Sequence, residues 1–164
     1  MLRCGRPAAN AAKKGDDMYY LKNIGIVARC SEMFRDERFS ALGLNGRQSV
    51  CLLHICRRPG ITQDALCKSL FIDKSNVTRQ MALLEETGYV TRCPDPSDRR
   101  QVCVYPTEKA LDTLPAIREG FSQWRAYLNA ALSDEELSML CQIADKLANR
   151  AAAYCGRIVT EEEA

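Results

Sequence analysis

The middle third of the chain constrains the fold most, because turn-forming residues divide it into pieces too short for long helices. Thr62 is an N-cap residue ahead of one short helical stretch, and Asp73 stands at the same place ahead of a second, which Gly88 ends. Two runs that favour β structure, 89–92 and 102–105, flank a polar loop. We expect two short helices separated by a tight turn, followed by a β-hairpin.

Longer amphipathic helices are predicted on both sides of this segment. Apolar residues recur at three- and four-residue steps over 18–42, over 107–132 and after Ser133. Asn45 and Ser133 each stand three residues before a Gln or Glu, which is the spacing of a capping box. Pro115 is expected to kink or delay the helix that contains it. The sequence therefore predicts a mainly α-helical fold with one small β-hairpin.

The helices of the middle segment have predictable inner and outer faces. In the helix after Asn45, Val50 and Leu53 are expected to face the core, and Cys51 is a further candidate. In the helix that begins at Asp73, an apolar stripe is formed by Val77, Met81 and Leu84. Polar residues remain on its outer side: Lys74, Ser75, Asn76, Thr78, Arg79 and Gln80.

This order of elements predicts a winged helix-turn-helix, and the outer side of the second short helix has the chemistry for DNA. Small polar groups near a helix N-terminus suit phosphates and base edges, and Arg79 can contact a guanine in bidentate fashion. Arg99 and Arg100 lie at the tip of the hairpin, where an arginine can enter a narrow minor groove. The net charge of +2 adds nothing to this prediction, because it is nearly neutral.

Two motifs in tandem resemble the MarR family of regulators. The stretch 73–79 with Leu84, Glu85 and Gly88 is similar to the family's recognition helix. The residues Asp98, Arg100, Val104 and Thr107 resemble its wing signature, D-x-R followed by V-x-L-T. The resemblance covers roughly 18–154, and Pro106 departs from it where the family usually has Leu.

The resemblance implies a mechanism that residues alone do not. A homodimer would bind a pseudo-palindromic operator in double-stranded DNA, with Asp98 orienting Arg100 through an ion pair. The first and last helices would form the dimer contact, through Tyr19, Tyr20, Ile24, Leu147, Ala151 and Tyr154; burial in the chain's own core is the alternative for these residues. A small aromatic or phenolic acid would release a repressor from DNA, in a cleft with candidate residues Arg29, Met33, Phe34, His54 and Trp124.

These expectations divide the chain into five regions. The predicted organisation is a mobile arm (1–17), a dimerisation helix (18–44), a winged helix-turn-helix lobe (45–107), C-terminal dimerisation helices (108–156) and an acidic tail (157–164). The sequence has neither the apolar core of a signal peptide nor an apolar run long enough for a membrane span. We expect a cytoplasmic regulator without a membrane partner.

The nine cysteines predict neither a disulfide framework nor a metal site. They are odd in number, contain no C-x-x-C pair and mostly lie in helical patterns, where a reduced cysteine packs as a small hydrophobe. A thiol-based redox sensor of the same fold remains an alternative. Relatives that use such a switch carry the cysteine near the start of the first helix, where this chain has Leu21. Cys93 and Cys103 flank the wing and could face each other across the hairpin.

Two further classes are disfavoured by the residues. An enzyme would need a nucleophile and a base, and Cys51 with His54 is the sole pairing of that kind, with no third group to orient it. A winged-helix module that binds protein would lack the arginine and small polar residues of 74–79. We therefore expect no catalysis, no metal and no cofactor.

Overall fold

The computed structural model describes residues 19–156, and the predicted arm and acidic tail lie outside that range. The helices are α1 (Tyr19–Phe39), a short 3-10 helix η1 (Ser40–Leu42), α2 (Gly46–Arg57), α3 (Gln63–Ser69), α4 (Lys74–Glu86), α5 (Glu108–Asn129) and α6 (Asp134–Tyr154). The strands are β1 (Ile61–Thr62), β2 (Val90–Pro94) and β3 (Val102–Pro106). The predicted fold class, mainly helical with a small β wing, is confirmed.

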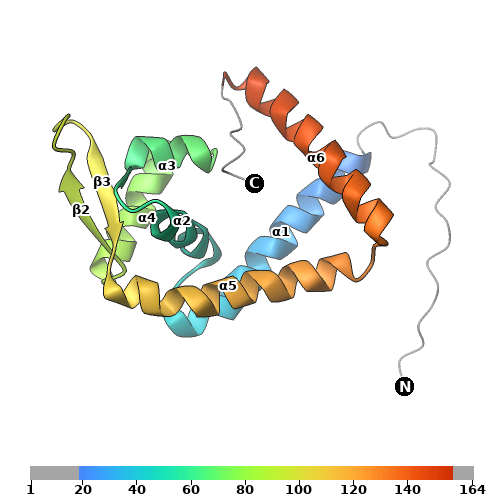
Figure 1. The fold of residues 1–164 in the computed structure, drawn as a ribbon, viewed down its shortest axis with the longest axis horizontal. Coiled ribbons are helices and arrows are strands. Elements are labelled where there is room, and N and C mark those ends of the chain that lie inside the picture. Colours follow the sequence, from blue (N-terminus) through green and yellow to red (C-terminus); the bar gives the residue numbers. More distant parts are fainter. Residues whose placement is uncertain (1–18, 157–164) are drawn as a thin grey trace.

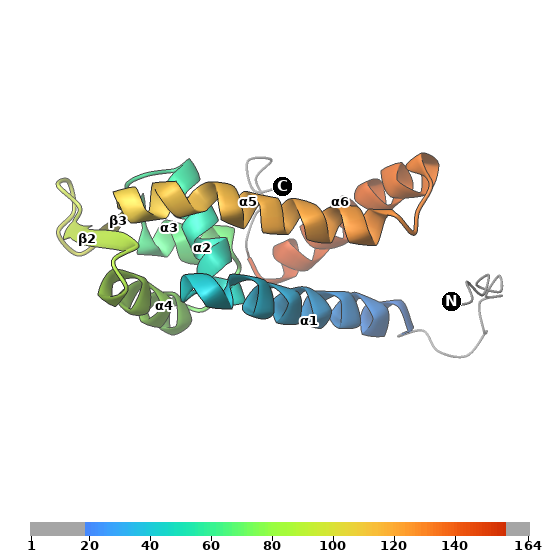
Figure 2. The same cartoon turned by 90° about the horizontal axis from the view of Figure 1, so that it is seen from below.

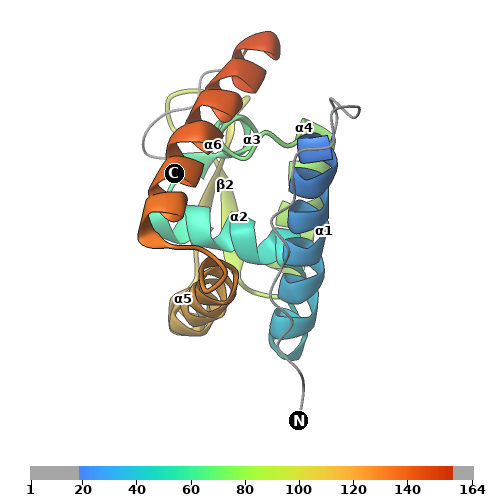
Figure 3. The same ribbon diagram turned by 90° about the vertical axis from the view of Figure 1, so that its right-hand side faces the viewer.

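The molecule has two ends of different character (Figure 1). The hairpin, α3 and α4 lie together at one end, and α6 with the start of α1 lies at the other. Figure 2 shows α1 and α5 as long rods that run between these ends, and Figure 3, viewed from the α6 end, shows α1 and α6 on opposite sides. Within residues 19–156, none of the helices has the length and apolar character that a bilayer crossing requires.

Local capping signals place most helix starts where the sequence predicted them. Asn45 and Ser133 form capping boxes with Gln48 and Glu136. The hydroxyl of Thr62 accepts a hydrogen bond from the backbone of Ala65 at the start of α3. Thr107 does the same for α5, which begins without delay and runs through Pro115.

The sheet has three strands, one more than predicted. Strand β3 lies between β1 and β2, and both neighbours are antiparallel to it. Backbone bonds from Thr107 to Tyr89 and from Asp95 to Gln101 set the alternation of the β2–β3 ladder, and this places Pro106 opposite Val90 in a pair without mutual hydrogen bonds. Pro106 thus costs no bond to β2, so the hairpin pairs regularly despite this departure from the family pattern.

The hydrophobic core lies in the lobe that carries the sheet and extends beyond the predicted 45–107. Phe39 at the end of α1 and Ile117 in the first half of α5 are fully buried in it. In α2 the prediction is only partly right: Cys51 is buried, whereas Val50 and Leu53 are only half-buried. The buried residues of that face are Cys51, Leu52 and Ile55. The stripe is rotated because α2 packs against α1, α5 and β3 at once, which periodicity alone does not reveal.

Candidate nucleic-acid interface

The exposed side of α4 carries most of the polar residues that the sequence proposed for DNA. Ser75, Thr78 and Arg79 are exposed, and Arg79 makes no ion pair with any part of the chain between 19 and 156. Asn76 is half-buried. The apolar stripe beneath them, Val77, Met81 and Leu84, is fully buried as predicted. Burial of this stripe fixes the rotation of α4 and so decides which side chains face outward.

Gln80 is a correction, because it does not lie on the outer side. Its side chain is only 5% exposed, and its Nε2 donates a hydrogen bond to Oδ1 of Asn76 at 3.3 Å. Gln80 follows Asn76 by one helical turn and lies next to the buried Met81, at the edge of the apolar stripe. Its contact supports Asn76 from inside the lobe, and DNA cannot reach it without a rearrangement.

Two contacts tie α4 to α3. Nζ of Lys74 lies 2.7 Å from Oδ1 of Asp64, and the hydrogen bond raises the pKa of Lys74. Oγ1 of Thr78 donates to the backbone oxygen of Lys74 at 2.9 Å and is 3.5 Å from Oε1 of Gln63. Asp73 holds the N-cap position of α4, but its side chain makes no capping hydrogen bond, contrary to the prediction. The start of α4 is therefore held by α3 instead of by its own cap.

The turn between α3 and α4 depends on Phe71, which adopts a left-handed conformation with φ of 53°. The backbone of Ile72 then donates to Cys67 at 3.2 Å, and that of Phe71 to Lys68 at 3.3 Å, which closes the end of α3. A glycine usually takes this conformation. The sequence therefore predicted the break between the two helices, but no glycine at position 71 indicated its left-handed geometry.

Asp95 organises the tip of the wing, the hairpin of residues 90–106. Its Oδ1 accepts hydrogen bonds from the backbone nitrogen and the hydroxyl of Ser97 at 2.7 and 2.6 Å, and from the backbone of Asp98 at 3.3 Å. The Ser97 hydroxyl, followed by the backbone nitrogen of Ser97, lowers the pKa of Asp95 to about 2. The site residues proposed from the sequence did not include Asp95, although an aspartate two residues before a serine is a signal for such a turn.

The ion pair that the resemblance implied between Asp98 and Arg100 is not present. Oδ1 of Asp98 accepts a hydrogen bond from the backbone nitrogen of Arg100 at 3.0 Å, and Oδ2 accepts one from Nε2 of Gln101 at 3.3 Å. Asp98 therefore shapes the turn, and the guanidinium groups of Arg99 and Arg100 are exposed. Both arginines are free to reach a partner outside the chain.

The wing and α4 are joined directly. Nε of Arg92 in β2 donates to Oε2 of Glu85 in α4 at 2.8 Å, and the backbone nitrogen of Arg92 donates to Oε1 at 3.2 Å. The Arg92 side chain lowers the pKa of Glu85, since it stabilises the carboxylate. Helix α4 and the hairpin therefore present their exposed arginines with a fixed spacing.

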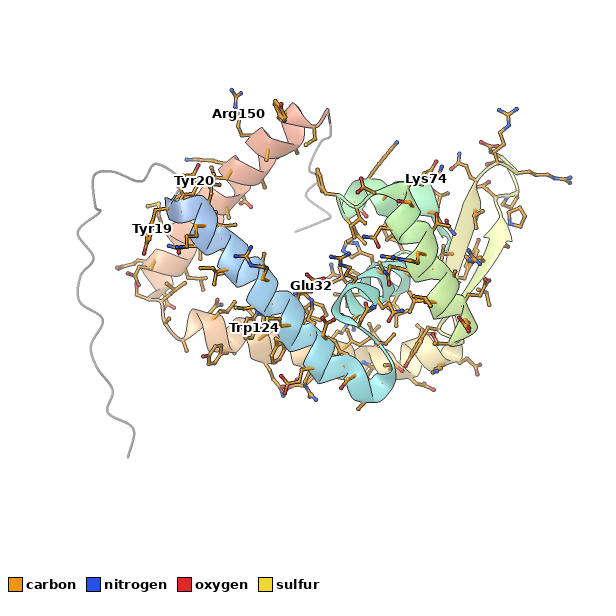
Figure 4. All side chains as sticks on the ribbon, turned by 180° about the vertical axis from the view of Figure 1, so that it is seen from behind. Tyr19, Tyr20, Glu32, Lys74, Trp124 and Arg150 are labelled. Atoms are coloured by element: carbon orange, nitrogen blue, oxygen red, sulfur yellow. The ribbon has the colours of Figure 1, made fainter. Side chains whose placement is uncertain are left out.

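The residues proposed for dimerisation and for an effector come from α1, α2, α5 and α6, outside α4 and the wing. In Figure 4, Tyr19 and Tyr20 lie far from Lys74, and Trp124 lies beside α1. Phe34 stacks on Trp124 with ring centroids 4.7 Å apart. Of the other effector candidates, Arg29 and Met33 are exposed and His54 is half-buried. The structure thus brings two of the five together in a direct contact.

The six dimerisation candidates are not part of the core of their own chain. All are exposed, and apart from Ala151 their exposed fractions run from 39% at Leu147 to 94% at Tyr154. Burial within the chain, the alternative for these residues, is therefore wrong. The catalytic pairing weighed from the sequence also finds no support, because burial raises the pKa of Cys51 to about 12 and keeps its thiol protonated.

Comparison with known proteins places this geometry in a family. A model described as MarR family matches residues 42–101, which contain α2, α3, α4 and most of the wing. The HTH-type transcriptional regulator YybA of Bacillus subtilis is 29% identical over 117 residues, which are 71% of this chain and 78% of that protein. The solved MarR protein of Peptoclostridium difficile has a TM-score of 0.80 at 26% identity, covering 89% of this chain and 95% of that one.

The chain belongs to the MarR family. It is a transcriptional regulator with a DNA-binding winged helix fold, and its family consists of regulators, not enzymes. A further similar structure is a MarR family regulator of Listeria monocytogenes in complex with a 26mer DNA, with a TM-score of 0.75 at 26% identity over 79% of this chain and 87% of that one.

Proposed function

We propose that this MarR-family protein is a homodimeric repressor that binds a pseudo-palindromic operator. Each α4 would enter a major groove, and each wing would enter the adjacent minor groove. The observation that carries the proposal is the pairing of two exposed, cationic elements, Arg79 on α4 and Arg99 with Arg100 on the wing, held together by Glu85 and Arg92. The similar regulator of Listeria monocytogenes that was solved in complex with a 26mer DNA supports DNA as the partner.

The proposed dimer is supported by apolar side chains on α1 and α6 that stay exposed among the described residues 19–156. On α1, Tyr19, Tyr20 and Ile24 are about half exposed, and α6 exposes a similar set on one side: Met139, Leu140, Ile143 and Leu147. Among the residues of α6, only Ala152 is buried. Apolar surface of this extent usually marks a protein contact. A second copy of the chain would cover it and would set the distance between the two α4 helices.

We also propose that the effector is a small aromatic acid, which binds where α1 and α5 pack together. Phe34 provides a flat apolar wall and stacks on Trp124, whose Nε1 donates to the hydroxyl of Ser31 at 2.8 Å. A hollow of about 330 Å³ lies beside Phe34, Glu37 and Arg38, and Arg38 could neutralise a carboxylate there. Such a ligand would release DNA only if it binds more tightly to a dimer whose two DNA-binding lobes, one from each subunit, are spaced differently.

The experiment measures operator binding by fluorescence anisotropy at a stated salt concentration. The DNA comes from the region upstream of the protein's own gene, and each base of the half-site is varied in turn. The Arg79→Ala variant is expected to lose on the order of 1 to 3 kcal/mol of binding free energy and to change the base preference at one position. The matched control is Arg125→Ala, an exposed arginine on α5 outside the proposed interface.

The outcomes separate the roles of Arg79. Uniform weakening across all sequences would assign Arg79 to a phosphate contact. Binding by the intact protein without any sequence preference would contradict the operator proposal. Salicylate and benzoate added to the same assay test the effector, which is wrong if neither these nor other small aromatic acids weaken binding.

A further inference from the structure

Two cysteines face each other across the wing. In the register of the hairpin, Cys93 of β2 is directly opposite Cys103 of β3. Residues directly opposite in an antiparallel pair project from the same face of the sheet, with Cα atoms about 5.5 Å apart in a hydrogen-bonded pair. The ladder bonds described above make this such a pair. That spacing falls inside the Cα range of disulfides, about 4.4 to 6.8 Å.

The two thiols differ in their accessibility. Cys93 is exposed, whereas Cys103 is only 3% exposed and donates a hydrogen bond from Sγ to Oδ2 of Asp95 at 3.4 Å. Burial, and then this contact with Asp95, raise the pKa of Cys103 and keep its thiol protonated. An oxidant from solution therefore meets Cys93 first, and Cys103 is the neighbouring group able to resolve the oxidised sulfur.

We propose that Cys93 and Cys103 form a reversible disulfide across the wing, which makes the hairpin a site of oxidation by hydroperoxides. The Cys93 thiol loses its proton and its sulfur attacks the peroxide, so that a sulfur–oxygen bond forms while the oxygen–oxygen bond breaks. The expelled alkoxide or hydroxide takes up the released proton and leaves as alcohol or water. The Cys103 sulfur then attacks the sulfenic acid of Cys93, the sulfur–sulfur bond forms, and hydroxide leaves as water with the Cys103 proton. The thiol pair is oxidised by two electrons and the peroxide is reduced by two.

The bond is a labile one on structural grounds. Cβ atoms of directly opposite residues are about 4.5 to 5.5 Å apart, whereas a disulfide brings them to about 3.8 Å. The two strands must therefore draw together at this pair. A strained disulfide with one accessible sulfur, here that of Cys93, is easily reduced, which is typical of regulatory bonds and not of structural ones.

The same bond changes the tip of the wing. When Cys103 turns to Cys93, Asp95 loses the thiol donor on Oδ2 while its Oδ1 still holds Ser97. The turn that Asp95 organises presents Arg99 and Arg100. Oxidation is therefore expected to weaken operator binding. This consequence rests on the DNA-binding function proposed above, whereas formation of the bond does not.

The bond is tested on the purified full chain, without DNA. Reduced protein is treated with a few equivalents of hydrogen peroxide and then digested with trypsin under non-reducing conditions. Arg92, Arg99, Arg100 and Lys109 place the two cysteines in separate peptides, 93–99 and 101–109. Mass spectrometry is expected to find these peptides linked, and the link is expected to disappear with dithiothreitol. Cys93→Ser should abolish it, and Cys141→Ser, which removes an exposed cysteine of α6, should retain it.

The second measurement is the affinity of reduced and oxidised protein for the operator. Oxidation is expected to weaken operator binding by about fivefold or more. About fivefold is the smallest loss of affinity expected when one arginine contact in a groove is lost. Dithiothreitol should restore the affinity, and Cys93→Ser should be insensitive to peroxide. Oxidation of the exposed Cys30 and Cys141 without a linked 93–99 and 101–109 pair would overturn the proposed bond. If the peptides are linked but the affinity is unchanged, the disulfide has no regulatory role. If the reduced protein binds no operator, the proposed DNA-binding function is wrong. The peptide map tests the disulfide in either case.

Discussion

Glu85 at the end of α4 holds Arg92 in β2, with Oε2 accepting a hydrogen bond from Nε at 2.8 Å and Oε1 accepting one from the backbone at 3.2 Å. The contact crosses from the helix proposed for the major groove to the hairpin proposed for the minor groove. Arg92 is opposite Val104 in the register of β2 and β3, so the contact with Glu85 connects α4 to both strands of the hairpin. The relative position of these two elements is thus set by the chain before any DNA is bound.

Replacing Arg92 by alanine is expected to weaken operator binding by a few-fold and to lower the thermal midpoint slightly. The fold keeps its buried core, but the hairpin loses its side-chain tie to α4. Anisotropy titrations and thermal melts measure the two effects. An unchanged affinity would show that the tie does not position the wing.

Acid should break the same tie. The folded pKa of Glu85 is lowered from its ordinary value of 4.5, so the carboxylate stabilises the fold above that value, and the stabilisation is lost as the pH falls through the lower folded pKa. At pH 6 the native chain is expected to have a higher free energy of unfolding than Glu85→Gln, and this difference should vanish at strongly acidic pH. Urea unfolding at several pH values measures it. A difference that persists unchanged in strong acid would contradict the role of the carboxylate.

Replacing Arg100 by alanine is expected to lower the dependence of operator binding on salt concentration. An arginine that neutralises one phosphate adds about 0.9 to the slope of log affinity against log salt. Titrations at four or more salt concentrations give the slope, and Arg125→Ala on α5 is the control. If the slope of Arg100→Ala equals that of the control, the wing tip does not contact the DNA backbone.

Replacing Gly120 by alanine is expected to destabilise the fold by about 1 to 3 kcal/mol, because it overpacks a close contact. A Cβ at Gly120 would lie 2.7 Å from Cε1 and 2.8 Å from Cζ of the buried Phe39 ring. Gly25→Ala is the matched control, since its nearest neighbour is the flexible end of Arg29 at 3.3 Å. Denaturant unfolding compares the two. Equal stabilities would mean that α1 and α5 are less tightly packed than the contact indicates.

Replacing Leu147 by glutamate is expected to convert the proposed dimer into monomers and to reduce operator affinity at least tenfold, because two half-sites no longer bind as one unit. Leu147 is 39% exposed on α6, and a buried unpaired carboxylate in the interface would be costly. Light scattering after size exclusion measures the mass. Leu111→Glu, at a half-exposed leucine of α5 in the other half of the molecule, should leave it unchanged. A native chain that is already monomeric would contradict the dimer.

Features that depend on neighbours in the chain could be predicted from the sequence. The capping boxes of Asn45 and Ser133 act over three residues, so their spacing alone identifies them. The stripe of Val77, Met81 and Leu84 follows the helical repeat, and it correctly indicated which side of α4 faces the core. These signals sufficed to predict the fold class.

Features that join distant segments were decided only by the tertiary structure. Strand β1 has two residues and exists because β3, some forty positions later, pairs with Ile61 and Thr62. Gln80 is polar and predicted to be exposed, yet the packed lobe buries it. The opposition of Cys93 and Cys103 depends on the register of the hairpin, which a shift of one residue would abolish. Periodicity reports which residues share a face, whereas burial and pairing depend on what packs against that face.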